Sequence, residues 1–268
     1  MLAPIEDMTS SVFRTTCCKY GADLAFTELS KIEALARKNK STLSRIELKD
    51  NTPTIIQLLG AKEYYFKKFL ENFKPSESFM GFNLNLGCPS PQIIQQGQGC
   101  AMIRRISKTQ RIINMLKEHG YNASIKMRLG INEKDKQNKI YLNLIEAVDA
   151  DFFVVHARHG MQGCKDPADF SVYEECVKTG KNIIANGDIK TKEQIEYLKK
   201  TGVKGAMIGR AAISEPSIFN RLKGIKSPSL EEIRDEYIQL SAKYNEKPRY
   251  RNNILKHLGK PLISYNEQ

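Results

Sequence analysis

Long apolar segments are missing from this sequence of 268 residues. A helix that crosses a bilayer needs about 20 consecutive apolar residues, and the nearest candidate, residues 152–155, is far shorter. The opening residues, MLAPIEDMTS, contain no basic stretch followed by an apolar one, so no secretory signal is expected. Apolar residues make up 41% of the chain and charged residues 27%, which is typical of a soluble globular protein. The composition therefore excludes membrane, collagenous and disordered classes.

Metal-binding patterns are also missing. The six cysteines show no CxxC or CxxH spacing, and the adjacent Cys17 and Cys18 cannot easily bridge each other or chelate a metal as a pair. The four histidines include no two with the helical spacing of a zinc site. We therefore expect no metal site. Without a secretory signal, the natural interpretation is reduced thiols and a cytoplasmic location.

Acidic residues are outnumbered, because 30 Asp and Glu stand against 42 Lys and Arg, for a formal net charge of +12. A pI near 9.3 suggests a polyanionic partner, most often nucleic acid. A lysine-rich surface without such a partner has the same composition, so the charge alone leaves both interpretations open.

Short apolar strands alternate with longer amphipathic helices along most of the chain. Strands are expected at residues 2–4, 24–28, 54–59, 81–86, 123–127, 151–156, 182–185 and 205–208. Helices are expected at residues 10–20, 61–73, 107–118, 138–147, 170–179, 191–201 and 215–222. This count predicts an α/β fold, a (β/α)8 TIM barrel. A doubly wound open sheet is the alternative, but it normally has fewer strands and a different glycine signature.

The alternation stops after Gly224, and Ser227-Pro228 then breaks the chain. Further helices are expected over residues 229–245 and 252–258. We therefore predict a barrel over residues 1–224 and a small helical domain over residues 225–268.

Functional residues of such a barrel lie where its strands end and in the loops that follow. Gly187 and Gly209 follow the seventh and eighth strands, where backbone N–H groups can approach an anion, and Arg210 can grip it. This pattern predicts a phosphorylated ligand, although glycines that only make tight turns would look the same.

Lys126 lies inside a buried strand, where an ammonium group is costly unless an anion meets it. A reduced flavin offers that partner, and a structural ion pair with a carboxylate is the alternative. His156 and Arg158 alternate at another strand end, so both can point into the barrel mouth. Cys88 lies on an exposed turn, although an isolated cysteine is more often inert packing. The competing thiol is Cys100, which is expected to pack at the start of a helix.

Many collinear motifs carry a family resemblance over residues 2–222. They read APIEDMTSSVFR, GADLAFTE, IIQLLG, NLNLGCP, GQGCAMI, IKMRLG, VVHARHG, ANGDI and AMIGRAAISEP. Together they strongly resemble the flavin-dependent tRNA dihydrouridine synthases. The resemblance implies a barrel that binds FMN, uses NADPH to reduce it, and reduces a uridine of tRNA or another RNA to 5,6-dihydrouridine.

By position, the resemblance also implies the roles of individual residues. The isoalloxazine ring would contact Ala3, Pro4 and Gln57, its pyrimidine edge would lie on Lys126 with His156 nearby, and the ribityl chain and phosphate would contact Asn186, Gly187, Asp188, Gly209 and Arg210. Asn85 and Arg158 would face the uracil. Hydride from flavin N5 would add at C6, and Cys88 would be the general acid that protonates C5 as a neutral thiol. The Cys88 loop would have to close over an extruded base.

The sequence departs from the family pattern in three respects. Its helical C-terminal part is short, position 83 is Asn where an acidic residue is common, and His159 replaces a usual hydroxyl residue. The alternative function is a small-molecule flavoenzyme of the dihydroorotate dehydrogenase type, which acts on a small pyrimidine. That substrate would not need the basic residues of positions 243–260, here called the basic tail.

The basic tail is expected to bind RNA. Residues 243–260 contain six Lys or Arg and one acidic residue, and three rings interleave with them, Tyr244, Tyr250 and His257. An earlier basic stretch contains Lys31, Arg37, Lys38, Lys40 and Arg45. A solvated helix face is the alternative for the tail. The chain is expected to act as a monomer.

Overall fold

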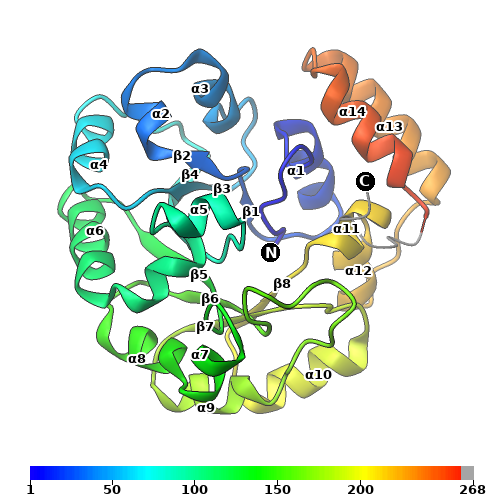
Figure 1. Ribbon diagram of the computed structural model, residues 1–268. Coiled ribbons are helices and arrows are strands. Elements are labelled where there is room, and N and C mark those ends of the chain that lie inside the picture. Colours follow the sequence, from blue (N-terminus) through cyan, green and yellow to red (C-terminus); the bar gives the residue numbers. More distant parts are fainter. Residues whose placement is uncertain (261–268) are drawn as a thin grey trace.

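The computed structural model describes residues 1–260 and is built on a curled sheet whose strand pairs are all parallel. The strands are β1 (Ala25–Phe26), β2 (Ser30–Lys31), β3 (Thr54–Leu59), β4 (Phe79–Leu86), β5 (Ala123–Arg128), β6 (Phe153–His156), β7 (Ile183–Asn186) and β8 (Gly205–Met207). Their order is β1-β3-β4-β5-β6-β7-β8, and β2 pairs with β3 beside this path. Figure 1 shows the helices as a ring around the sheet. The predicted TIM-like α/β fold is confirmed.

The N-terminal residues lie between the two edges of the sheet. Leu2 donates its N–H to Leu24 O (2.8 Å) just before β1, and Ala3 donates to Ile208 O (2.8 Å) just after β8. The strand predicted at residues 2–4 is therefore only a single bridge, from Leu2 to Ile208. Pro4 has no N–H with which to extend it. The strand predicted at residues 24–28 also shortens, to two residues, because the chain then turns to form β2.

Alternation along the strands separates two apolar cores. The outer core lies between sheet and helices and includes Ile56, Leu84, Ile125, Val155 and Ala185. The inner core fills the barrel with Ala3, Phe26, Ile55, Val154, Ile184 and Met207. Polar residues replace this inner set toward the carboxyl ends of the strands, which places the barrel mouth there.

The predicted helices are present with shifted ends. They are α1 (Ser11–Lys19), α4 (Glu63–Leu70), α6 (Ile106–Glu118), α8 (Ile140–Ala147), α9 (Val172–Lys178), α10 (Lys192–Thr201) and α12 (Ile218–Lys223). The sequence did not predict α2 (Ile32–Ala36), α3 (Lys40–Ile46), α5 (Pro91–Gln95), the 3-10 helix η1 (Gly99–Arg104), α7 (Glu133–Gln137) and α11 (Arg210–Ser214). At five to seven residues each, these helices are too short to show a clear apolar period.

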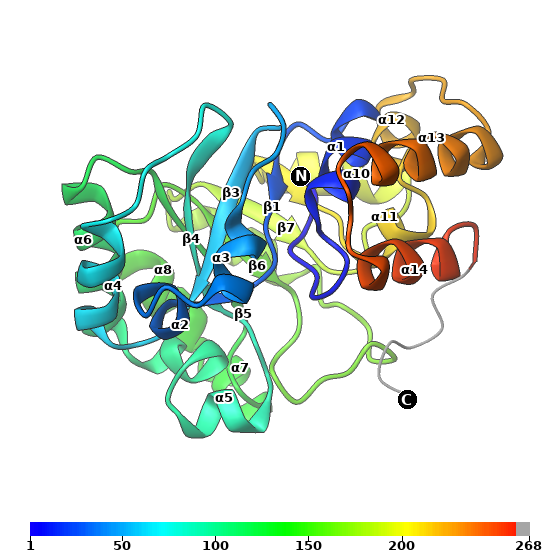
Figure 2. The same ribbon diagram turned by 90° about the horizontal axis from the view of Figure 1, so that it is seen from above.

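The C-terminal part consists of α13 (Leu230–Lys243) and α14 (Pro248–His257). The second helix begins earlier than predicted, because Pro248 is well suited to a first helical position. Both helices contribute to one apolar cluster with α1, through Tyr237, Ile254 and Phe13, and Figures 1 and 2 both show α13 beside α1. Residues 261–268 of the predicted extension lie outside the described residues. None of the helices within residues 1–260 is both long and apolar enough to span a membrane.

Candidate active site at the barrel mouth

Two loops meet where β7 and β8 end. Asn186 closes β7, and its backbone N–H donates to the Tyr173 hydroxyl (2.9 Å). Gly187 follows with a φ of +128°, and a Cβ there would lie 3.1 Å from His156 Cδ2, so only glycine fits without strain. Within residues 1–260, the backbone N–H groups of Gly187 and Gly209 donate to no protein acceptor. The two loops therefore retain donors for an anion.

Asp188 connects these loops through two arginines. Its carboxylate accepts hydrogen bonds from Arg158 and from Arg210. Burial alone would raise the pKa of this carboxyl, but the hydrogen bond from Arg158 and the charges of both arginines outweigh it, and the pKa is lowered. Two guanidinium groups that share one carboxylate leave an excess positive charge, which suits a phosphate.

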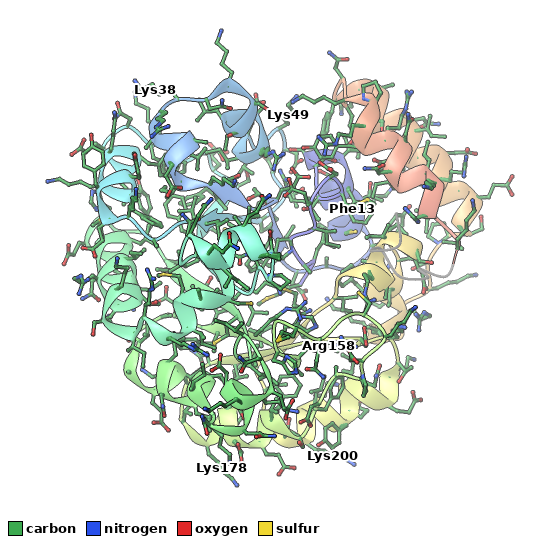
Figure 3. All side chains as sticks on the ribbon, in the orientation of Figure 1. Phe13, Lys38, Lys49, Arg158, Lys178 and Lys200 are labelled. Carbon is green, nitrogen blue, oxygen red and sulfur yellow. The ribbon has the colours of Figure 1, made fainter. Side chains whose placement is uncertain are left out.

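Arg158 is buried near the centre of the ring of helices (Figure 3). Its Nε donates to Asp166 O (2.7 Å), and its Nη1 lies 3.3 Å from His156 Nε2. Burial and then the charges of Lys126 and the neighbouring arginines hold the pKa of His156 well below its usual value, so the ring is neutral. Nε2 therefore accepts from Arg158, and Nδ1 carries the proton.

Lys126 points from β5 toward the same face, beside Asn85 of β4 in the strand register. Within residues 1–260, no hydrogen bond or ion pair joins its Nζ to another residue. Burial and then repulsion from Arg128 lower the pKa of Lys126 to about 8. The alternative of a structural ion pair with a carboxylate is therefore wrong for the described residues, and the ammonium group still lacks the anion that would offset its burial.

The Cys88 loop is held by Asn85. Asn85 Oδ1 accepts from the backbone N–H groups of Gly87 (3.0 Å) and Cys88 (2.9 Å). Cys88 O in turn accepts from Cys100 N (3.0 Å), and Cys88 remains partly exposed. Cys100 is buried within η1, as expected, and burial raises the pKa of its thiol to about 12. Of these two thiols, Cys88 is the one open to a ligand.

The remaining predicted residues lie around the same mouth. Gln57 is buried near the end of β3 and donates from Nε2 to Asn83 Oδ1 (2.8 Å). Ala3 belongs to the inner core, and its Cβ would lie 3.4 Å from a Cβ built on Gly209. Pro4 follows Ala3 and is partly exposed. The fold thus brings residues from six strand ends to one face of the barrel.

Sequence reasoning assigned no site role to several polar residues near the mouth. Asn83 and Ser124 are buried beside Gln57, and Arg128 donates to the carbonyls of His159 (2.8 Å) and Gln162 (3.1 Å). Asn83 interrupts an otherwise apolar stretch, and that polar residue at an inward position was the available signal. For Ser124 no comparable signal exists, because a small hydroxyl residue is common in strands.

This fold and mouth define a TIM-like barrel with a cationic, hydrogen-bonding site at its carboxyl end. A crystallised nitroalkane oxidase from Streptomyces ansochromogenes shares the fold, with a TM-score of 0.50 and 13% identity over 80% of this chain and 65% of that one. The profile of the family described as Dihydrouridine synthase (Dus) matches residues 1–266. The chain belongs to the dihydrouridine synthase family.

Curated relatives carry matching names. A Helicobacter pylori protein named "Probable tRNA-dihydrouridine synthase" is 29% identical over 232 residues, which cover 83% of this chain and 69% of that protein. A human protein, 28% identical over 228 residues, is similar over 83% of this chain and 35% of its own length. The human protein is named "tRNA-dihydrouridine(47) synthase [NAD(P)(+)]-like".

Proposed function

We propose that this protein reduces the C5–C6 double bond of specific uridines in tRNA, with FMN as the bound cofactor and NADPH as the reductant. The observation that carries the proposal is the family membership over residues 1–266 together with a mouth that fits a flavin phosphate. The fit rests on the N–H groups of Gly187 and Gly209 and the ammonium of Lys126, which have no partner among residues 1–260, and on Arg210, which pairs with Asp188.

FMN supplies hydride at the flavin ring when it is bound. Around it, Lys126 offers a positive charge to the pyrimidine edge of the ring, where the reduced flavin is anionic. His156 is neutral and presents its Nδ1–H as a donor. Ala3, Pro4 and Gln57 would contact the ring. Asn186 and Asp188 hold the loop that binds the ribityl chain and phosphate.

Asn85 has one group left for a substrate. Its Oδ1 already accepts two backbone hydrogen bonds, and its Nδ2 donates to Gln57 Oε1 (2.9 Å), so a single N–H has no acceptor in the described part of the chain. A lone donor suits a carbonyl oxygen of uracil, where negative charge develops when hydride adds at C6. Arg158 also has one free Nη1 hydrogen within the described residues, and we assign it to the uracil.

Cys88 completes the reduction as the general acid. Hydride addition at C6 forms an enolate of the pyrimidine, and the Cys88 thiol then gives its proton to C5. The thiolate left behind regains a proton from water. The base must leave the RNA stack to reach the mouth.

The RNA would lie across two basic stretches that the fold brings together. Lys247 Nζ, just before α14, donates to Ser44 Oγ of α3 (3.0 Å), which joins the C-terminal extension to the early basic stretch. Exposed Lys40, Arg251 and Lys256 extend from this junction without ion pairs among residues 1–260. Their charge suits phosphates of a backbone.

The test is product formation. Purified protein is incubated with FMN, NADPH and transcripts of its own tRNAs, and dihydrouridine is measured in the digested RNA by mass spectrometry. Dihydrouridine in the transcripts supports the proposal. No product, together with turnover of a free orotate-like pyrimidine, would support a small-molecule flavoenzyme instead.

The Cys88→Ala variant tests the acid. The variant should keep the flavin absorbance at about 450 nm and bind RNA normally. It should form dihydrouridine about 100-fold more slowly or worse, since a general acid contributes a factor of about 10² or more to the rate. Activity at the wild-type level would move the acid role elsewhere, and Cys100 would be the first residue to examine.

A further inference from the structure

Four polar side chains form a continuous hydrogen-bonded chain beneath the Cys88 loop. Ser124 of β5, Asn83 of β4 and Gln57 of β3 are direct neighbours in the strand register. Asn83 Nδ2 donates to Ser124 Oγ (2.9 Å), and Gln57 Nε2 donates to Asn83 Oδ1 (2.8 Å). Asn85 Nδ2 donates to Gln57 Oε1 (2.9 Å). We call these residues the amide relay.

The two ends of the amide relay fix its direction. At one end, the backbone N–H groups of Gly87 and Cys88 require an acceptor, so Asn85 must turn its oxygen to them and its nitrogen to Gln57. At the other end, the Ser124 hydroxyl donates to Phe82 O (3.2 Å) and therefore accepts from Asn83. Every amide between these ends has one orientation that satisfies all of its partners.

The barrel does not need polar residues at this place in order to fold. Elsewhere the barrel interior is filled by apolar side chains, such as Ile55 of β3 and Val154 of β6 in the inner core. Asn83 and Ser124 are both almost fully buried, and buried polar groups contribute little net stability compared with apolar groups of the same shape. The amide relay thus has a cost that packing alone does not explain.

We propose that Asn83 and Ser124 are positioning residues for the reduction, which hold Gln57 and Asn85 in the orientation that fixes the Cys88 loop. Neither residue reaches the substrate. Loss of the Asn83 oxygen leaves Gln57 Nε2 without its acceptor, so Gln57 can turn over and offer nitrogen instead of oxygen to Asn85. Asn85 then loses the partner that aims its oxygen at the loop. This inference rests on the proposed function for its catalytic readout, but not for its structural one.

The experiment compares three variants of the full chain loaded with FMN. Asn83→Leu removes the relay amide, Asn83→Asp keeps an oxygen for Gln57, and Ser124→Ala removes the distal acceptor. Thr54→Val is the matched control, since it deletes a buried hydroxyl on β3 that, within residues 1–260, bonds only to Thr52 O (2.8 Å), outside the relay. Bound FMN, kcat and KM for tRNA are measured for each protein.

We expect Asn83→Leu and Ser124→Ala to lower kcat by about 10- to 100-fold, the scale of a small misplacement at a reacting centre. KM for tRNA and the FMN content should stay near wild type. Asn83→Asp should recover most of kcat, and Thr54→Val should not change it. Wild-type kcat in both Asn83→Leu and Ser124→Ala would overturn the proposal, and so would an equal loss in Thr54→Val. If Asn83→Leu does not fold, Ser124→Ala carries the test.

A second readout does not depend on dihydrouridine formation. The rate at which iodoacetamide alkylates Cys88, followed by peptide mass spectrometry, reports the position of the loop. It should change several-fold in Asn83→Leu and Ser124→Ala, and it should match wild type in Thr54→Val. If the protein makes no dihydrouridine but its variants show this alkylation pattern, the result supports the amide relay and contradicts the proposed function. Unchanged alkylation in both relay variants overturns the relay itself.

Discussion

At the scale of single residues, Lys126 is expected to lower the stability of the protein without a cofactor and to favour the binding of an anionic cofactor. Its pKa of about 8 lies below the ordinary lysine value because burial disfavours the charged form. At neutral pH the folded protein must therefore hold a proton that it binds less well than the unfolded chain does. An anionic edge of the proposed FMN would offset this cost. A substitution that removes the charge is therefore expected to raise the stability of the protein without FMN and to lower its affinity for FMN.

Lys126→Met is expected to stabilise the protein without FMN by about 1–3 kcal/mol at pH ~7, an upper range set by the pKa shift and reduced for partial exposure. Since the native pKa is lowered, the unfolded state binds more protons, and the wild type gains stability as pH rises from about 8 toward the ordinary lysine pKa of about 10.4. The advantage of the variant should therefore vanish above that range. Urea unfolding at several pH values measures it.

The same variant should bind FMN at least about 10-fold more weakly, the effect of losing one charge-assisted contact. Flavin fluorescence quenching measures that affinity. A variant with lower stability at neutral pH and unchanged FMN affinity would contradict both parts of the argument. Lys126→Arg, which keeps the charge, is the control for FMN affinity.

At the scale of elements, local signals were predictable and contacts between strands were not. The helices that begin after Thr191 and Ser229 carry complete capping boxes, which four consecutive residues encode. The two-residue strand β2 has no periodicity to detect, so it was missed. The amide relay depends on which residue of β3 faces which residue of β4 and β5, and that register does not follow from any one segment.

Some features of the candidate site could be predicted from the sequence and others could not. The glycines and Arg210 at the strand ends could be predicted, because parallel strands bring their carboxyl ends to one face. The sharing of Asp188 by Arg158 and Arg210 could not, since it depends on the turn at Gly187 and on how the loop after β6 folds back. Asp188 itself has a φ of +49°, an uncommon conformation that could not be predicted from the sequence.

The turn after β7 provides a matched pair of glycines. Gly187 and Gly180 both have positive φ, but a Cβ at Gly187 would press on His156 and Ala168 at 3.1 Å, whereas one at Gly180 meets nothing within 4 Å. Gly187→Ala should therefore destabilise the protein by about 2–3 kcal/mol and weaken FMN binding, and Gly180→Ala should cost only about 1 kcal/mol with FMN binding intact. Thermal unfolding and flavin titration distinguish them, and equal effects would refute the close approach at Gly187.

At the scale of the whole molecule, part of the basic tail is bound to other parts of the fold. Arg249 pairs with Asp7, and Arg45 of the earlier stretch lies 3.7 Å from Glu28, whose carboxylate also accepts from the Tyr250 hydroxyl (2.8 Å). These contacts attach the C-terminal helices to the barrel and leave fewer cations for a ligand than the sequence suggests. Within α14, Arg251 and Lys256 are exposed and form no ion pair among residues 1–260, so both can contact RNA.

The double variant Arg251→Gln and Lys256→Gln should weaken tRNA binding and lower the slope of log Kd against log salt by about 1–2, since each phosphate contact contributes about 0.7–0.9. FMN absorbance should not change, because α14 contributes none of the residues assigned to the cofactor. Filter binding at several salt concentrations measures the slope.

The matched control removes the same number of charges from the opposite side of the ring. Lys178 of α9 and Lys200 of α10 are exposed and unpaired within residues 1–260, and Figure 3 places them at the edge opposite Lys38 and Lys49. Changing both to Gln gives the same net charge as the α14 variant. If the +12 charge acts only as a diffuse attraction, the two double variants will bind tRNA equally weakly. If RNA lies across α3 and α14, only the α14 variant will lose affinity and salt dependence.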